Sequence, residues 1–112
     1  MTDIFIDLDK PVFAANADLS LLQMIKEGKF RWPNGATCAT QDCDGAITWW
    51  DAPIEEVCAA RVSATPEDGL MPLIGLANSV NEDYYEVDER AYTANDWLTA
   101  VVSHDEFLAA SD

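Results

Sequence analysis

The stretch FRWPNGATCATQDCDGAITWWD, residues 30–51, decides the fold that we predict for this chain. Two short runs rich in Thr, Ile and Trp, Ala36–Gln41 and Ala46–Trp50, flank a tetrapeptide that ends in Asp44-Gly45. Asp-Gly readily adopts the positive φ angles of a tight turn. The pattern therefore predicts a β-hairpin.

A two-residue turn at Asp44-Gly45 also predicts the register of this hairpin and its two faces. The expected pairs are Cys43/Ala46, Asp42/Ile47, Gln41/Thr48, Thr40/Trp49 and Ala39/Trp50. One face would carry Cys38, Thr40, Ile47 and Trp49, and the other would carry Ala39, Gln41, Thr48 and Trp50. A tryptophan can bury about 150–250 Å² of surface, so we expect at least one of the pair to nucleate the core.

The composition indicates a single domain over residues 1–112. Hydrophobic residues make up 49% of the chain and include four tryptophans, which is typical of a globular protein with one core. No apolar run approaches the roughly 18 residues of a membrane span. The first ten residues lack the basic start and the apolar run of a signal peptide. We therefore expect a cytoplasmic protein.

Charge is the feature of the composition that bears most on function. The chain carries 21 acids and 6 bases, for a net charge of −15. Residues 1–31 hold five acids and four bases, or −1, whereas residues 32–112 hold sixteen acids and two bases, or −14. Proteins that bind nucleic acid use clustered Lys and Arg against phosphates, so direct binding is disfavoured. An acidic surface is instead attracted to proteins that bind nucleic acid.

Further elements are expected on both sides of the hairpin. Alternating apolar residues predict a strand over residues 4–8, and a helix is expected over residues 17–27, with Asn16 or Asp18 as its cap and Gly28 as its stop. A second helix is predicted over residues 54–62, because Ile54, Val57, Cys58, Arg61 and Val62 follow an amphipathic stripe. Residues 65–69 indicate a loop, and residues 70–80 stay unassigned because Pro72 and Gly75 interrupt them.

The last third of the chain predicts one strand and one helix. Residues 81–90 alternate, with Glu82, Glu86 and Asp88 on one face. Thr93 and Asp96 resemble a capping box that opens a helix through Val102, and Ser103 and Glu106 repeat the pattern for a short final turn. The expected fold is α+β, a small antiparallel sheet of three to four strands with two to three helices packed on one face.

The residues that could bind a metal or act in catalysis do not form a convincing site. Cys38, Cys43, Cys58 and His104 lack the close cysteine pairs of zinc sites. Asp42 and Asp44 lack the later ligands of a calcium loop. His104, the single histidine, has no Ser or Cys partner near it in sequence. We therefore predict no enzyme, no cofactor and no metal.

Part of the hairpin resembles a module common in small phage proteins. The residues are Trp32-Pro33-Asn34-Gly35-Ala36-Thr37, Gln41-Asp42, Asp44-Gly45 and Trp49-Trp50. In the module, a Pro-x-Gly-Ala-Thr start leads through an acidic Gly turn into an aromatic strand. The position after Thr37 is often His there and is Cys38 here. The resemblance implies an origin in a phage or a mobile element.

A small, strongly acidic phage protein also resembles the anti-CRISPR and anti-restriction inhibitors, several of which mimic DNA. This second resemblance lies in size and charge, so it implies a role but no residue-level site. By that role, the protein would inhibit a host CRISPR–Cas effector subunit, or another basic DNA-binding protein, in the bacterial cytoplasm.

Strand geometry supports the same function independently. Alternate strand residues lie about 6.6–6.8 Å apart, close to two phosphate steps of about 3.4 Å each. The rows Glu82/Glu86/Asp88 and Asp3/Asp7/Asp9 would present carboxylates at phosphate-like intervals, with Tyr84 as an aromatic anchor. The predicted partner-binding residues are Glu82, Asp83, Tyr84, Glu86, Asp88 and Glu89, with Glu55, Glu56 and Asp42 as secondary candidates.

Three alternatives stay open at this stage, the last of which is a small hydrolase. The protein could be a phage structural or assembly protein, or another interaction module that does not mimic DNA. The acids could also merely solvate an exposed face and keep a strand edge from aggregating. The sequence leaves the target protein and the choice between monomer and dimer undecided.

Overall fold

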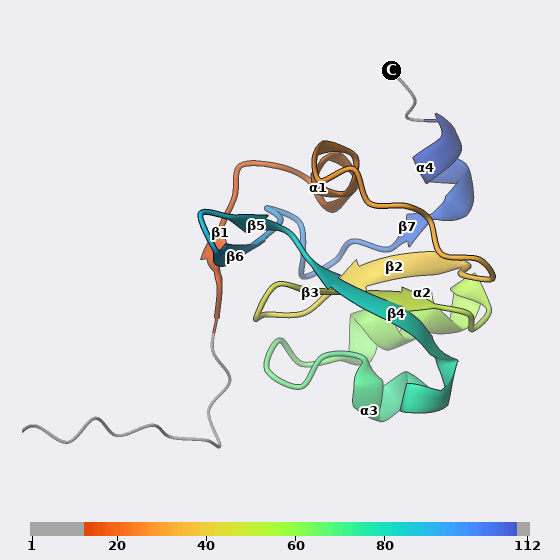
Figure 1. Ribbon diagram of the computed structural model, residues 1–112. Helices are drawn as coiled ribbons and strands as arrows, with labels where there is room; N and C mark the ends of the chain where they lie inside the picture. Colours follow the sequence, from red (N-terminus) through yellow and green to blue (C-terminus); the bar gives the residue numbers. More distant parts are fainter. Residues whose placement is uncertain (1–12, 110–112) are drawn as a thin grey trace, which may run out of the picture.

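The computed structural model describes residues 13–109, which form two sheets with helices around them (Figure 1). The larger sheet has the strand order β4-β3-β2-β7 and the smaller one the order β1-β6-β5. In chain order the elements are β1 (Ala15–Asn16), α1 (Leu21–Glu27), β2 (Cys38–Gln41), β3 (Ala46–Trp50), α2 (Ile54–Ser63), α3 (Met71–Ile74), the 3-10 turn η1 (Leu76–Asn78), β4 (Ser79–Tyr84), β5 (Glu86–Val87), β6 (Arg90–Thr93), β7 (Val102–Ser103) and α4 (His104–Ala109). The strand expected at residues 4–8 lies outside the described residues.

The central hairpin forms as predicted, but its register is shifted by one residue. Gln41 pairs with Ile47 and Cys38 with Trp50, so the predicted pairs and faces are wrong. The loop contains three residues rather than two, because the Asp42 N–H donates to the Ala46 carbonyl oxygen at 2.9 Å. Gly45 takes a φ of +96°, which completes a three-residue hairpin with a left-handed last position.

The hairpin is buried on both of its faces, and all nine residues of β2 and β3 are buried. On one face Ala39, Ile47 and Trp49 pack with α1. On the other face Cys38 and Trp50 pack with α2 and α3. The structure confirms the α+β class and the small antiparallel sheet, but the helices cover both faces rather than one (Figure 1).

The buried Gln41 side chain joins the smaller sheet to the hairpin. Its Nε2 donates to the carbonyl oxygens of Tyr92 and Gly45, each at 3.0 Å. Its Oε1 accepts a 2.7 Å hydrogen bond from the Ala94 N–H, just after β6 ends. Gln41 is fully buried. This one side chain of β2 therefore satisfies three backbone groups, those of Gly45, Tyr92 and Ala94.

The first helix begins later than predicted. Its cap is Ser20, not Asn16 or Asp18, and Ser20 and Gln23 form a reciprocal capping box. Asp96 lies close by, and its Oδ1 accepts a 2.8 Å hydrogen bond from the Leu21 N–H. Gly28 ends the helix, as the sequence predicted.

The second helix was predicted almost to the residue, although its buried stripe was only partly right. Val57 and Arg61 are buried, whereas Cys58 is exposed and Val62 is 87% exposed. The unassigned residues after it form α3 and η1, and β4 then begins at Ser79.

The single strand predicted over residues 81–90 is wrong. β4 ends at Tyr84, and the chain then forms the separate hairpin β5–β6 of the smaller sheet. Its turn holds Asp88 and Glu89 at φ values of +54° and +67°. Two successive positive φ angles produce the tight twist that such a turn needs. Glu82, Glu86 and Asp88 therefore do not share one strand face.

The helix predicted from Thr93 to Val102 is also wrong. Residues 95–99 form turns, and Thr93 is the last residue of β6. The final capping box is confirmed, because the Ser103 N–H donates to Glu106 Oε1 and the Glu106 N–H donates to Ser103 Oγ, both at 3.0 Å. It opens α4.

We predict that Gln41→Met destabilises the domain by about 2–4 kcal/mol, because it leaves several buried backbone groups without hydrogen bonds. Urea denaturation followed by tryptophan fluorescence measures the change. Gln23→Met is the matched control, since Gln23 is exposed and supports only a helix cap, and it should cost about 1 kcal/mol or less. Equal losses for the two variants would contradict a central role for Gln41.

Candidate acidic interface

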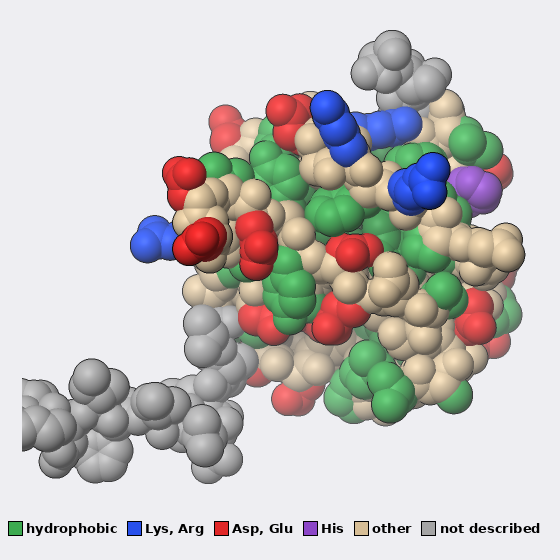
Figure 2. Space-filling model, viewed as in Figure 1, with side chains coloured by type: hydrophobic (Ala, Val, Ile, Leu, Met, Phe, Trp, Pro, Cys, Tyr) green, Lys and Arg blue, Asp and Glu red, His purple; other side chains and the backbone are tan. Residues whose placement is uncertain are grey.

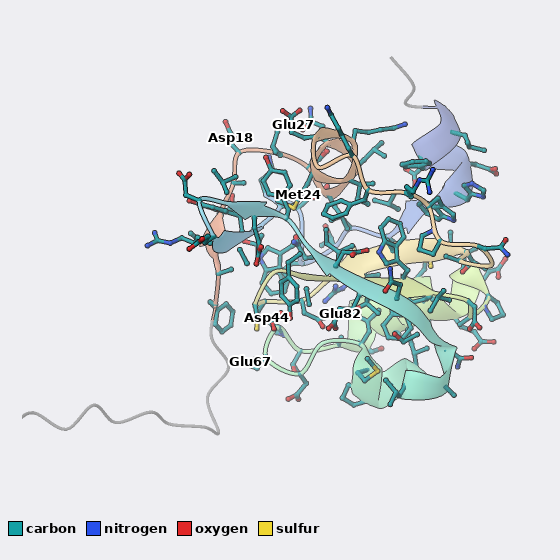
Figure 3. All side chains as sticks on the ribbon, viewed as in Figure 1. Asp18, Met24, Glu27, Asp44, Glu67 and Glu82 are labelled. Carbon is teal, nitrogen blue, oxygen red and sulfur yellow. The ribbon has the colours of Figure 1, made fainter. Side chains whose placement is uncertain are left out.

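The hairpin loop and the end of β4 bring several acidic side chains together. Asp42 and Asp44 lie in the β2–β3 loop, while Glu82 and Tyr84 lie on β4 opposite Thr48 and Ala46. Directly paired residues share a sheet face, so Glu82 and Tyr84 lie on the face that α2 and α3 cover. Figure 3 shows Asp44, Glu82 and Glu67 in the same part of the molecule. We call Asp42, Asp44, Glu82 and Tyr84 the acidic cluster.

Two members of the cluster, Asp42 and Tyr84, have raised pKa values. Burial raises the pKa of Asp42 to about 6, and the charges of Asp44 and Glu82 act in the same direction. Arg61 opposes the shift only in part. Burial also raises the pKa of Tyr84, with contributions from Asp44, Glu82 and Asp42. The charges of Asp44 and Glu82 act on both Asp42 and Tyr84, so the four side chains lie close enough together to belong to one binding surface.

Arg61 lies near Asp42 of the acidic cluster, and among the described residues only its Nη1 has hydrogen-bond partners, while Nε and Nη2 are buried without one. It is only 5% exposed. Its Nη1 donates to the carbonyl oxygen of Gln41 at 3.0 Å and to that of Trp97 at 3.3 Å. Burial lowers the pKa of Arg61, and Asp42 partly offsets this effect. The acidic groups facing solvent therefore remain available to an external cation.

The other predicted residues are distributed over three places. Asp83 faces the opposite side of β4 and accepts a 2.8 Å hydrogen bond from the indole Nε1 of Trp49, so it satisfies a buried group. Glu86, Asp88 and Glu89 form a second acidic group, exposed on the β5–β6 hairpin. Glu55 and Glu56 are exposed in the first turn of α2.

The structure adds Asp44 to the predicted residues. The sequence explained it as a turn former, and its Oδ1 does accept a 3.0 Å hydrogen bond from the Ala46 N–H. Its charge also reaches Asp42 and Tyr84. Its place beside Asp42 in a tight loop is the sequence signal that could have identified it.

The basic side chains lie in two places on the face shown in Figure 2. Several gather over α1 and the segment after it, where acidic side chains also lie, and another lies beside the acidic ones of the β5–β6 hairpin. Those of the first group are Lys26, Lys29 and Arg31, and the Lys26 Nζ lies 4.1 Å from the Phe107 ring centroid. In β6, Arg90 is exposed next to Glu89 of the hairpin turn.

Catalysis or metal binding was considered for the cysteines, His104, Asp42 and Asp44. Within residues 13–109, no group of three or more His, Cys, Asp and Glu side chains is arranged to hold a metal ion. Burial raises the pKa of the Cys38 thiol, which disfavours its reactive thiolate. The exposed His104 ring stacks on Trp32 with the ring centroids 4.8 Å apart.

Comparison of the chain with protein-family models, with curated proteins and with solved structures finds no match. Among the helices that the structure describes, none is long and apolar enough to cross a membrane.

We predict that the domain becomes more stable as the pH falls from about 7 to about 4. The pKa of Asp42 is about 6 in the folded protein, above its ordinary value of 3.8, so the folded state binds the proton more tightly than the unfolded state. The stabilisation by protonation is complete below about pH 4 and is lost as the pH rises through 6. It should amount to about 1–3 kcal/mol.

Urea denaturation at several pH values checks this expectation. Asp42→Asn should flatten the dependence, because the amide does not titrate. Asp18→Asn, which removes the same charge from an exposed loop residue, should leave it nearly unchanged. A wild-type stability that rises with pH across this window would contradict the role of Asp42.

Proposed function

We propose that this protein inhibits a nucleic-acid-binding protein of the host by occupying its basic surface, in the manner of anti-CRISPR and anti-restriction inhibitors. The observation that carries the proposal is the convergence of Asp42, Asp44 and Glu82, with Tyr84, at one end of the sheet. A groove lined with Lys and Arg for phosphates accepts carboxylates by the same electrostatic attraction.

The proposed binding surface is a patch rather than a linear row of acids. It combines the acidic cluster with Glu86, Asp88 and Glu89 on the neighbouring β5–β6 hairpin. Tyr84 is 41% exposed, so its ring can contact a partner while the surrounding carboxylates meet basic side chains. A patch of this kind supports fast association that weakens at high salt.

A second candidate function is assembly with a virion protein through an apolar contact. Leu73 and Leu76 favour it, because they are 53% and 74% exposed on α3 and η1. An apolar contact of this kind depends little on salt, which separates the two candidates experimentally.

We expect Glu82→Lys/Glu86→Lys to abolish capture of the host partner without unfolding the domain, because both residues are exposed. The experiment is a pull-down from a bacterial host lysate, washed at low and high salt and eluted with competing duplex DNA. Asp18→Lys/Asp51→Lys is the matched control, with the same change in net charge elsewhere on the surface.

The proposal predicts a DNA-binding protein that salt or DNA releases from the wild type and from the control, but that the Glu82/Glu86 variant does not capture. Equal capture by both variants would refute the acidic patch. A captured virion protein that resists salt would favour assembly instead.

A further inference from the structure

The strand β4 forms an edge of the larger sheet. In the order β4-β3-β2-β7 it has β3 on one side and, within residues 13–109, no strand on the other. It is six residues long, and its residues are exposed or half-buried. Figure 1 shows β4 crossing the front of the molecule. An uncovered edge of this length presents backbone groups to any extended chain.

The hydrogen-bonding pattern shows which backbone groups face outward. The carbonyl oxygens of Ala46 and Trp50 accept hydrogen bonds from the side of β2. Backbone groups alternate in direction along a strand of an antiparallel sheet, so Ile47 and Trp49 face β4. Their partners on β4 are Asp83 and Asn81. The N–H and C=O groups of Glu82 and Tyr84 therefore point away from β3.

We propose that an extended, basic segment of the partner protein adds to β4 as a further strand. This inference rests on the proposed function, since it describes how the partner binds the acidic surface. The outward groups of Glu82 and Tyr84 would pair with the backbone of the added segment. Side chains alternate along that segment, so one set of Lys or Arg residues would lie next to Glu82 and Tyr84.

Charge selects this occupant over a second copy of the chain. An antiparallel pairing of two β4 strands that uses most of their length brings Glu82 or Asp83 opposite or diagonal to the same residue of the other copy. Like charges in such positions are destabilising, and each copy also carries a net charge of −15. A basic strand meets the same positions with opposite charge.

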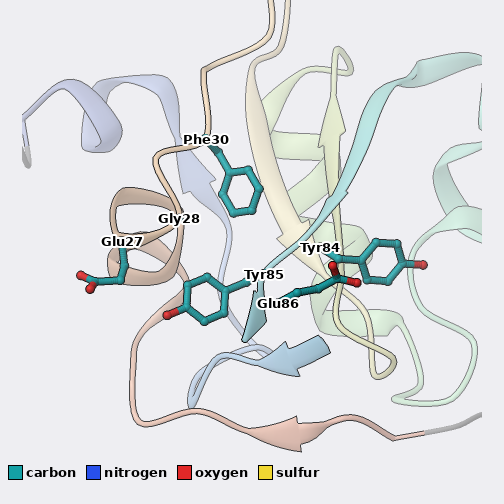
Figure 4. Close-up of a pocket in the computed structure, with 6 residues that line it drawn as sticks. All are labelled: Glu27, Gly28, Phe30, Tyr84, Tyr85 and Glu86. Carbon is teal, nitrogen blue, oxygen red and sulfur yellow. The ribbon is translucent and has the colours of Figure 1, made fainter. Parts of the chain in front are cut away.

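A pocket at the end of β4 offers a place for one basic side chain. Its volume is about 410 Å³, and its lining residues are Glu27, Gly28, Phe30, Tyr84, Tyr85 and Glu86 (Figure 4). Phe30 and Tyr85 lie on the α1 side of the strand, while Tyr84 is directed away from α1. Aromatic rings with nearby carboxylates attract Lys and Arg side chains. The pocket thus offers a basic side chain acidic and aromatic neighbours, as the strand edge does.

Amide hydrogen exchange measured by NMR tests the inference with a capped peptide of alternating Lys and Thr. In the free protein the amides of Glu82 and Tyr84 should exchange quickly. The peptide should slow both of them, and this protection should weaken as salt is added. A peptide of the same sequence, N-methylated at alternate residues, keeps the charge but cannot pair along its backbone, so it should give no protection.

A pair of variants separates backbone pairing from charge. Glu82→Pro removes a carboxylate and an N–H that β3 does not use, whereas Glu82→Gln removes only the charge. The proline variant should bind the peptide roughly tenfold more weakly than wild type, and the glutamine variant about two- to threefold more weakly. Far-ultraviolet circular dichroism checks that both variants are folded.

The outcomes distinguish this inference from the proposed function. Equal binding of the two peptides, equal effects of the two variants, or no peptide binding at all would overturn strand addition. The charge-reversal pull-down would still test the acidic patch by itself. Protection that only the unmethylated peptide gives, together with a larger effect of Glu82→Pro, would establish the edge as the docking site.

Discussion

The buried side chain of Gln41 is the interaction on which the rest of the structure depends. It donates to the Tyr92 and Gly45 carbonyl oxygens and accepts from the Ala94 N–H. These bonds fix the end of β6 against the hairpin loop. The Gln41 backbone carbonyl also accepts from Arg61, so α2 is connected to the same residue. The side-chain amide of Gln41 thus connects the two sheets, and its backbone carbonyl group connects them to α2.

This arrangement has consequences for the surface. The loop after Gln41 carries Asp42 and Asp44, and β3 places Glu82 and Tyr84 of β4 beside them. Because the hairpin is buried on both faces, its own acids lie at its end, beside those of the outer strand. Several acidic side chains therefore lie where β4 also exposes its backbone. The acidic side chains and the open edge of β4 thus lie in one region of the molecule.

The sequence was informative where the signal is local. Asp44-Gly45 identified the hairpin, the apolar stripe identified α2, and Ser103 with Glu106 identified the cap of α4. The register failed because an Asp-Gly pair fits both a two-residue and a three-residue loop. Ser20 and Gln23 form a recognisable capping box, so this helix start could have been found.

Other features depend on contacts between distant residues. Asp96 looked like part of a local cap, yet it binds the Leu21 N–H, 75 positions away. The Asp88-Glu89 turn contains no Gly or Asn to indicate it. For the candidate site, the sequence predicted Glu82, Tyr84 and Asp42 as partner-binding residues but not their convergence, which arises from strand pairing. Asp83 was predicted to bind a partner. In the structure it accepts a hydrogen bond from Trp49 on the neighbouring strand, a contact that the local sequence does not indicate.

We propose that the acidic end of the sheet competes with DNA for a basic protein surface. The most direct measurement is the fluorescence anisotropy of labelled duplex DNA bound to the captured host protein, followed as this protein is added at several salt concentrations. We expect complete displacement of the DNA at low salt, because the carboxylates and the phosphates would compete for the same basic side chains. An anisotropy that stays unchanged while the two proteins still bind each other would contradict it.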